Sequence, residues 1–156
     1  MLKRFMERKE DEDGFTLIEL MVVVLIIGIL IAIALPTFLG ARTRAQNRAA
    51  QSDLRNALVA AKTLYTDNST YAGATAAGLP AVEPSLTYVA GAATGTAVGI
   101  MAAPTATDWS ASRLSASGFC YYISDTSTAG TKYGQAAAAG ACAAPTVALA
   151  NNASWT

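Results

Sequence analysis

The sequence contains no histidine, and charged residues make up only 14% of its 156 residues. Without histidine, neither a Ser-His-Asp nor a Cys-His nucleophile can be built, and histidine metal sites are excluded. Lys plus Arg equal Asp plus Glu, with 11 of each, so the net charge provides no basic surface for nucleic acid. We therefore predict no nucleic-acid binding.

Carboxylates are sparse beyond residue 19, where they are limited to Asp53, Asp67, Glu83, Asp108 and Asp125. A calcium loop needs clustered acidic ligands, and no D-x-D spacing occurs late in the chain. A hydrolase needs a nucleophile with a base beside it, and the sequence offers no such pair. We predict no catalytic residue, no metal and no cofactor, and an enzyme of the cell envelope is a remote alternative.

One long apolar run dominates the N-terminal third of the chain. Every residue at positions 20–35 is apolar or glycine, and Glu19 is the only charge within residues 15–35. At about 1.5 Å per residue, these 21 residues form a helix about 30 Å long, which matches the hydrocarbon core of a bilayer. The run predicts a membrane-spanning helix, and a buried helix of a soluble protein is the alternative.

The helix is expected to continue over residues 37–67, where helix formers dominate and no further proline occurs. Small or apolar residues recur there at helical spacing. They are Phe38, Ala41, Ala45, Leu54, Ala57, Leu58, Ala61, Leu64 and Tyr65. The Asp-Asn-Ser triplet at 67–69 provides a stop, because these side chains compete for backbone hydrogen bonds. We predict one helix of about fifty residues with an amphipathic second half, and with Gly28 or Pro36 as the place for any bend.

Residues 68–156 are rich in Ala, Gly, Thr and Ser, and they predict a small antiparallel sheet domain. Strand-like pieces occur at 86–90, 96–102, 112–117 and 119–124, between turn residues. Three or four such strands packed on the amphipathic half of the helix would bury both apolar faces. We expect residues 125–156 to be loop. The predicted fold class is α+β, a long N-terminal helix packed on a small antiparallel sheet.

The two cysteines, Cys120 and Cys142, both lie in this C-terminal region. An even pair in an exported domain favours one disulfide, whereas two separate thiols are the alternative. The bond would close a loop of about 23 residues, worth roughly 3 kcal/mol in the chain-entropy account.

Nine charged residues precede Gly14, and the apolar run begins directly after it. A secretory signal cut after Ala34 would release a secreted binding domain, but it would split the predicted helix. A plain uncut anchor explains the length of the run but explains neither Glu19 nor the abrupt junction. In a third interpretation, a leader is removed between Gly14 and Phe15 while the apolar run is retained.

The sequence GFTLIELMVVV at residues 14–24, which continues to Gly28 and Pro36, resembles the N-terminus of the type IV pilin family. In that family a membrane peptidase cuts after the glycine and methylates the new terminal amine. The resemblance therefore implies cleavage between Gly14 and Phe15, N-methylation of Phe15 and a role in assembly for Glu19. It also implies the following division: leader 1–14, apolar membrane and filament-core half-helix 15–36, amphipathic half-helix 37–67 and sheet domain 68–156.

Glu19 has a physical reason to take part in assembly. A carboxylate in lipid costs a few kcal/mol unless it has a partner. Cutting after Gly14 creates a cationic amine on Phe15, and in a bundle of staggered helices this amine can meet the Glu19 of a neighbour. Such a pair would fix the axial register of the helices, because aliphatic surface is non-directional. An interfacial carboxylate in contact with water is the alternative.

The resemblance implies a structural subunit of a type IV pilus. Its partners would be further copies of itself, the prepilin peptidase, the pilus assembly machinery and the cytoplasmic membrane. Before assembly the chain would span that membrane once with its N-terminus inside, and afterwards it would lie in an extracellular pilus. Gly28 and Pro36 would give the helix flexibility. The alternative is a major pseudopilin of a type II secretion or competence system, which shares the N-terminal segment, although the cysteine pair favours a pilin.

Overall fold

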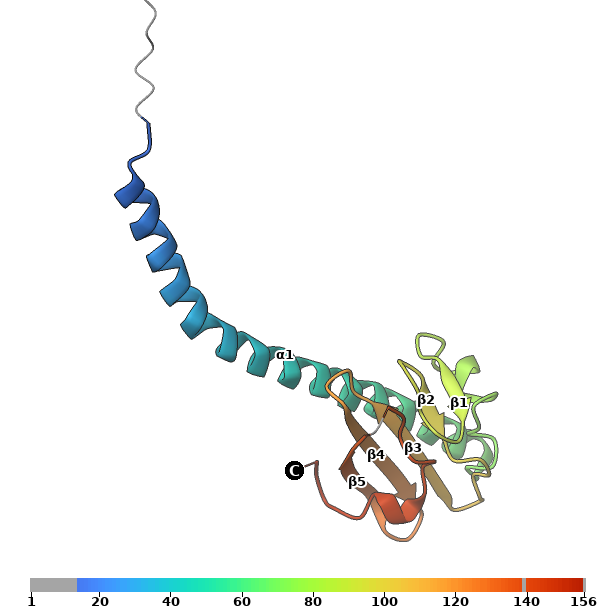
Figure 1. The fold of residues 1–156 in the computed structure, drawn as a ribbon. Coiled ribbons are helices and arrows are strands. Elements are labelled where there is room, and N and C mark those ends of the chain that lie inside the picture. The colour runs from blue at the N-terminus through green and yellow to red at the C-terminus, as the bar shows by residue number, and fades with distance from the viewer. Residues whose placement is uncertain (1–13, 139, 156) are drawn as a thin grey trace, which may run out of the picture. The chain divides into compact units, whose positions relative to one another are not determined.

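A computed structural model describes residues 14–138 and 140–155 of the chain (Figure 1). Its elements are α1 (Leu17–Asn68), η1 (Leu79–Ala81), β1 (Tyr88–Ala90), β2 (Val98–Ile100), β3 (Asp108–Leu114), β4 (Phe119–Thr126), β5 (Gly130–Ala137) and η2 (Val147–Leu149). The described part forms two compact units that meet at residue 40 within α1. Residues 1–13 of the predicted leader lie outside the described residues. The α+β fold class predicted from the sequence is confirmed.

The single long helix is the element that the sequence predicts best. It runs for 52 residues and continues through Gly28 and Pro36 without interruption. It ends at Asn68, whose side-chain amide donates to the carbonyl oxygen of Leu64 at 3.1 Å. Ser69 follows with a left-handed φ of 54°. The predicted stop at 67–69 is therefore confirmed, because polar side chains there satisfy the helix end and turn the chain.

The second unit is built on one face of the C-terminal half of α1. The helix residues buried there are Ala50, Leu54, Ala57, Leu58, Ala60 and Ala61. They pack against sheet residues that include Val98, Ile100, Trp109, Ala111 and Ile123, all without solvent exposure. Phe38, Ala41 and Ala45 were also predicted to belong to the packed stripe, but they are exposed. That part of the prediction is wrong, because the first residue of α1 that the sheet unit buries is Ala50.

The sheet has five strands in the order β1-β2-β3-β4-β5. Strands β2 to β5 pair antiparallel, whereas β1 and β2 are parallel. The predicted count of three or four strands is therefore too low, and the loop predicted for 125–156 is wrong over residues 130–137, which form β5. Strand β5 has few large apolar residues, and it forms because the turn after Thr126 folds it back onto β4.

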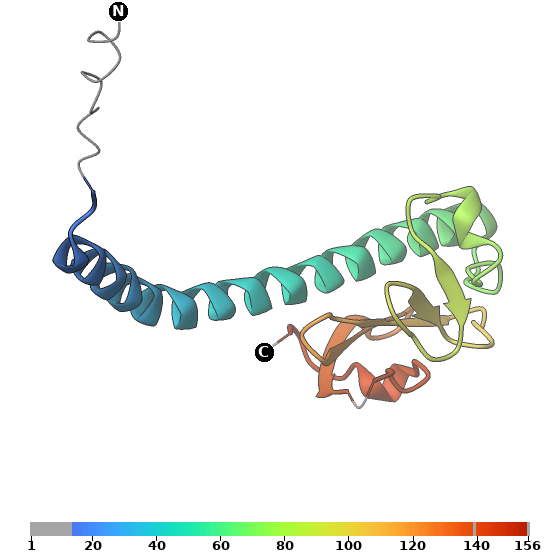
Figure 2. The same ribbon diagram turned by 45° about the horizontal axis from the view of Figure 1, so that its top comes forward.

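Both faces of the central strands are covered, which explains the weak alternation in the sequence. In Figure 2 the helix lies along one face of the sheet and the C-terminal segment lies against the other. The five central residues of β3 are all buried, as are seven of the eight residues of β4. On the face away from α1, Cys120, Tyr122, Cys142 and Ala150 form a second buried cluster. Strands buried on both faces read as continuous runs rather than as alternation.

Two strand glycines are required by close backbone contacts. A Cβ atom on Gly99 in β2 would lie 2.3 Å from the carbonyl oxygen of Gly91 in the loop that joins β1 to β2. A Cβ atom on Gly134 in β5 would lie 1.9 Å from the carbonyl oxygen of Leu149 in η2. These contacts let a short loop and the C-terminal segment cross directly over the sheet.

Candidate functional site

The predicted cleavage junction lies at the start of the described chain. Gly14, Phe15 and Thr16 have no regular secondary structure, and α1 begins at Leu17. The side chain of Phe15 is 80% exposed. The peptide bond between Gly14 and Phe15 is thus outside the helix, in a segment without regular structure.

Thr16 and Glu19 form a reciprocal cap on the first turn of α1. The backbone N–H of Glu19 donates to the hydroxyl of Thr16 at 3.2 Å. The carboxylate of Glu19 accepts from the hydroxyl of Thr16 at 3.1 Å and from its backbone N–H at 3.4 Å. This arrangement is a capping box, which satisfies backbone donors that the helix leaves unpaired. Glu19 therefore already has hydrogen-bond partners within its own chain.

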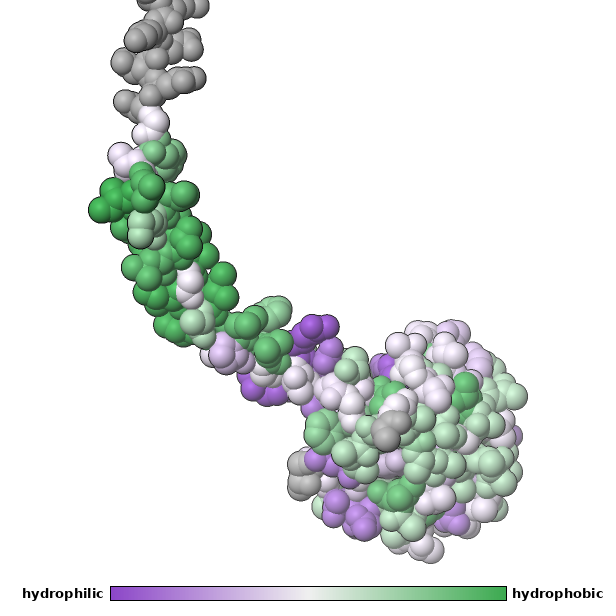
Figure 3. All heavy atoms as spheres, viewed as in Figure 1, coloured by the Kyte–Doolittle hydropathy of each residue, from purple (hydrophilic) through white to green (hydrophobic). Residues whose placement is uncertain are grey.

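The N-terminal half of α1 exposes apolar side chains around its whole circumference. Every large apolar residue from Leu17 to Leu39 is at least 45% exposed. In Figure 3 the visible face of this stretch is mostly hydrophobic, and strongly hydrophilic side chains follow it. Within the described residues, α1 is the one helix whose length and composition suit a membrane crossing. A helix that is apolar all round needs lipid or other apolar helices about it.

The two residues predicted to give flexibility, Gly28 and Pro36, both lie within this apolar half. No atom lies within 4 Å of the position that a Cβ on Gly28 would occupy. Pro36 has no N–H to donate to the preceding turn. The adjacent Thr37 hydroxyl donates to the carbonyl oxygen of Ala34 at 2.8 Å, and a hydroxyl of this kind helps to satisfy backbone near a helix proline.

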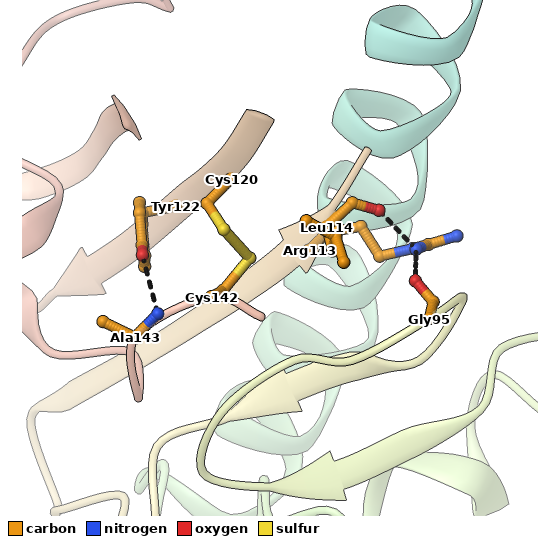
Figure 4. Close-up of a disulfide and its surroundings, with 7 residues drawn as sticks. All are labelled: Gly95, Arg113, Leu114, Cys120, Tyr122, Cys142 and Ala143. Atoms are coloured by element: carbon orange, nitrogen blue, oxygen red, sulfur yellow. Dashed lines mark hydrogen bonds between the residues drawn. A yellow bond between two sulfur atoms is a disulfide. The ribbon is translucent and has the colours of Figure 1, made fainter. Parts of the chain in front are cut away.

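The disulfide predicted from the cysteine pair is present and joins Cys120 in β4 to Cys142, with 5.4 Å between their Cα atoms (Figure 4). It closes the C-terminal segment over the face of the sheet away from α1. The Tyr122 hydroxyl accepts from the backbone N–H of Ala143 at 3.1 Å and holds the same segment. The indole N–H of Trp155 donates to the carbonyl oxygen of Tyr122 at 3.1 Å. The C-terminal segment is therefore fixed to β4 by covalent and polar contacts.

A cluster of polar side chains around Asp125, which the sequence analysis missed, connects α1 to the sheet. Asp125 in β4 is only 8% exposed at its side chain, and its carboxylate lies 3.0 Å from the ammonium of Lys62. The same carboxylate accepts a hydrogen bond from the Tyr71 hydroxyl at 2.5 Å and another from the Thr131 hydroxyl. Two regions of the sequence, separated by 54 residues between Tyr71 and Asp125, meet at this buried carboxylate. No short motif in the sequence could reveal this.

The cluster shifts two pKa values in opposite directions. Burial acts to raise the pKa of Asp125, but the hydrogen bonds from Thr131 and Tyr71 and the nearby Lys62 outweigh it and hold the pKa below its ordinary value. Burial, reinforced by the hydrogen bond to Asp125, raises the pKa of the Tyr71 phenol. The site thus keeps an ionised carboxylate beside a neutral phenol, which is a stabilising arrangement.

A second ion pair connects α1 to β3. The guanidinium of Arg113 donates to the carboxylate of Asp53 at 3.0 Å. Its other end donates to the carbonyl oxygens of Gly95 and Leu114 at 2.8 and 2.7 Å, as Figure 4 shows. The contacts of Arg113 therefore position the loop before β2 against the end of β3.

The sequence of this chain is similar to sequences of known proteins. The model of the prokaryotic N-terminal methylation motif matches residues 11–35. The type IV major pilin protein PilA of Myxococcus xanthus is 45% identical over 58 residues, which are 37% of this chain and 26% of that protein. The type II secretion system core protein G of Klebsiella michiganensis is 38% identical over 88 residues, 52% of this chain and 61% of that protein. The chain is a homologue of type IV pilins and type II secretion core proteins.

A third relative matches a similar share of the chain. The type IV wide pilus major component PilA4 of Thermus thermophilus is 35% identical over 82 residues, 50% of this chain and 63% of that protein. The chain thus spans about a quarter of the first of these relatives and about three fifths of the other two. No solved structure matches the chain.

The matched methylation motif covers most of the residues singled out in the sequence. Gly14, Phe15, Glu19 and Gly28 all lie within the matched residues 11–35. Thr16, whose side chain caps the helix, lies there too, and the sequence analysis overlooked it. The T-x-x-E spacing of Thr16 and Glu19 before an apolar run is a readable sign of a capping box.

Proposed function

We propose that this chain is a structural subunit of a type IV pilus, which polymerises through its N-terminal helix. Its leader is cut between Gly14 and Phe15, and the new amine of Phe15 is methylated. The observation that carries the proposal is the fully exposed apolar half of α1, which bears a single carboxylate, Glu19, one turn from the new terminus. The role is structural, and no residue is assigned a catalytic step.

The apolar half-helix has a place in two successive environments. Before assembly it spans the cytoplasmic membrane, with residues 1–14 inside and the sheet unit outside the cytoplasm. After cleavage, assembly machinery moves it from lipid into a bundle of the same helices from other subunits. This exchange gains little hydrophobic energy, since lipid is as apolar as a neighbouring helix. Packing, specific polar contacts and the work of the machinery must therefore drive it.

Glu19 provides the specific polar contact in this proposal. In the single chain its carboxylate is held by the Thr16 cap. Cleavage adds a cationic amine at Phe15, which is the strongest partner that a carboxylate can find among otherwise apolar helices. The amine of an incoming subunit and the Glu19 of its neighbour meet at only one axial offset, so the pair sets the register.

The experiment that tests this role replaces Glu19→Ala and measures both leader cleavage and the yield of filaments. We expect cleavage to proceed normally and filaments to be abolished or severely reduced. Normal filament yield from this variant would contradict the register role.

A matched variant separates the intermolecular pair from the helix cap. Thr16→Val removes the hydroxyl half of the capping box but leaves the Glu19 carboxylate in place. We expect it to weaken the first helical turn by about 1 kcal/mol while filaments still form. Equal loss of filaments in both variants would assign the defect to the cap instead.

A major pseudopilin is the second candidate, because relatives named type II secretion system core protein G cover up to 52% of this chain. The two functions differ in what a cell loses when the chain is deleted. A pilin predicts loss of surface filaments with normal secretion, whereas a pseudopilin predicts loss of protein secretion. The disulfide loop favours the pilin.

A further inference from the structure

Two arginines line an open pocket near the start of the second unit. Arg44 and Arg48 lie one helical turn apart on α1, and the pocket beside them has a volume of about 330 Å³. Both side chains are exposed, and neither forms an ion pair with any residue that the structure describes. No acidic residue is among the described residues that line the pocket. Two guanidinium groups thus border a hollow that contains no counter-charge.

The amide groups in the pocket wall add hydrogen-bond donors. The side-chain oxygen of Asn47 accepts from the hydroxyls of Ser115 and Ser117, so its NH₂ group is left to donate. Gln51 lies one turn further along α1 and hydrogen-bonds Tyr121 on the pocket floor. A lining of guanidinium and amide donors suits the oxygens of a phosphate or carboxylate group.

Three aromatic rings and Gln135 complete the lining of the pocket. Tyr121 is buried, Trp155 is half-buried and Phe119 is 37% exposed. The Tyr121 and Trp155 rings meet edge to face with 6.1 Å between their centres. Rings with one apolar face and one polar edge, next to cations, are the side chains that proteins place at the boundary between a bilayer and water.

The position of the pocket along α1 matches the boundary between a bilayer and water. The last large apolar residue of the exposed run is Leu39, and Arg44 and Arg48 follow it by five and nine residues. At about 1.5 Å per residue, these are roughly 8 and 14 Å along the helix. Side chains on a helix lean toward its N-terminus, so both arginines extend back toward the apolar run. This lean brings their guanidinium groups closer to the layer of lipid headgroups, which is on the order of 5–8 Å thick.

We infer that the Arg44–Arg48 pocket binds the phosphate of an anionic phospholipid headgroup while the chain is held in the membrane. The inference rests on the membrane-anchored stage of the proposed function. The bound headgroup fixes the height of the sheet unit above the bilayer, and it must leave when the subunit is extracted.

A lipid fits this pocket better than an acidic side chain of a second copy. Two of the described acids, Asp53 and Asp125, are already engaged in ion pairs within the chain. A headgroup, by contrast, is present next to any chain that is anchored through residues 17–39. Basic side chains at a membrane surface attract anionic lipid, each with an appreciable contribution.

The test uses the purified full-length chain in detergent micelles that contain equal amounts of phosphatidylglycerol and phosphatidylcholine. Native mass spectrometry then counts the lipids that each chain retains. We expect the wild-type chain to retain phosphatidylglycerol roughly ten-fold over phosphatidylcholine. The double variant Arg44→Gln with Arg48→Gln should bring this ratio close to one, and glutamine preserves the helix.

The control removes the same charge elsewhere, by Arg42→Gln with Lys132→Gln. Arg42 is nearer to the apolar run but does not line the pocket, and neither does Lys132. The control should keep most of the preference. An equal loss in both double variants would reveal unspecific charge attraction and overturn the assignment.

Three further outcomes are decisive. An unchanged lipid preference in the double variant of Arg44 and Arg48 overturns the inference. If this variant keeps the lipid preference but loses filaments, the pocket is instead a contact with a second copy of the chain. Displacement of the lipid by millimolar inorganic phosphate would make free phosphate the ligand. Retention of the lipid under that challenge supports the headgroup. Because the assay needs neither cleavage nor assembly, its failure would leave the pilus proposal to be judged by the Glu19 variant alone.

Discussion

At the scale of single residues, two acids show two ways of holding a carboxylate with hydrogen bonds. Glu19 sits on the exposed apolar half of α1 and is held by the cap with Thr16. Asp125 is buried between α1 and β4 and is held by Lys62, Tyr71 and Thr131. The first arrangement uses only local hydrogen bonds, which a stronger partner can replace. The second is locked by tertiary structure, and we assign it to stability.

Replacing Asp125→Asn should lower the free energy of unfolding by about 2 kcal/mol, because charge-assisted hydrogen bonds are lost and Tyr71 keeps a weaker acceptor. The partly exposed Lys62 adds little to this figure, since solvent screens its charge. Urea unfolding of the full chain in detergent, followed by the fluorescence of the buried Trp109, measures the change. The control Asp67→Asn alters an exposed acid and should be nearly neutral.

Asp125→Asn should also change the pH dependence of the free energy of unfolding. The folded-state pKa of Asp125 lies below its ordinary value, so its contribution is complete above the unfolded pKa of about 4 and is lost as the pH falls through the folded pKa. Tyr71 has a raised pKa, so its contribution is complete below about pH 10 and is lost at more alkaline pH. Asp125→Asn should flatten the acid limb; an unaltered acid limb would contradict this role.

At the scale of elements, the second unit depends on the narrow buried face of α1. Leu54 is fully buried against the sheet, whereas Val59, just over one turn later, is 65% exposed. The buried face is otherwise mostly alanine, so the helix lies close to the strands and one large side chain contributes much of the packing.

Leu54→Ala should therefore destabilise the second unit by about 2–5 kcal/mol, because it leaves a cavity that small neighbours cannot fill. Val59→Ala serves as the matched control and should shift stability by less than about 0.5 kcal/mol. Urea unfolding followed by Trp109 fluorescence compares the two variants. Similar effects of both would mean that the sheet does not pack on the Leu54 face.

The accuracy of the sequence predictions differs among elements for physical reasons. The helix was predictable to within a residue or two, because its apolar run, helix formers and polar stop all act locally. Strand β5 was missed because its residues are small or polar, and only its pairing with β4 makes it a strand. The first half of β3, residues 108–111, was missed because Asp108 and Ser110 are polar, and the burial of Ser110 is not indicated by any propensity.

The candidate sites likewise divide into those set by local sequence and those set by the completed fold. The disulfide between Cys120 and Cys142 was predictable, since only two cysteines exist and they form one pair. The Thr16 cap was readable from local spacing but was overlooked. The Asp125 cluster and the Arg44–Arg48 pocket each join segments that lie 54 or more residues apart, so their composition depends on the completed fold.

At the scale of the whole molecule, the chain combines an apolar helix that needs apolar surroundings with a sheet unit that folds around its own core. Among residues 14–40, the part of the first unit that the structure describes, none is buried by the chain itself. The second contains the buried clusters on both faces of the sheet and the disulfide. The exposed apolar helix needs apolar surroundings, and we propose that these are a membrane before cleavage at Gly14 and an assembly of the same chains after it.

The most direct test of that step is the intact mass of the protein in filaments sheared from the cell surface, together with the mass of its N-terminal peptide. The account predicts a chain that begins at Phe15, carries one added methyl group on its amine and, before reduction, is lighter by the two hydrogens of the Cys120–Cys142 bond. A filament protein that retains residues 1–14, or that begins at any residue other than Phe15, would contradict it.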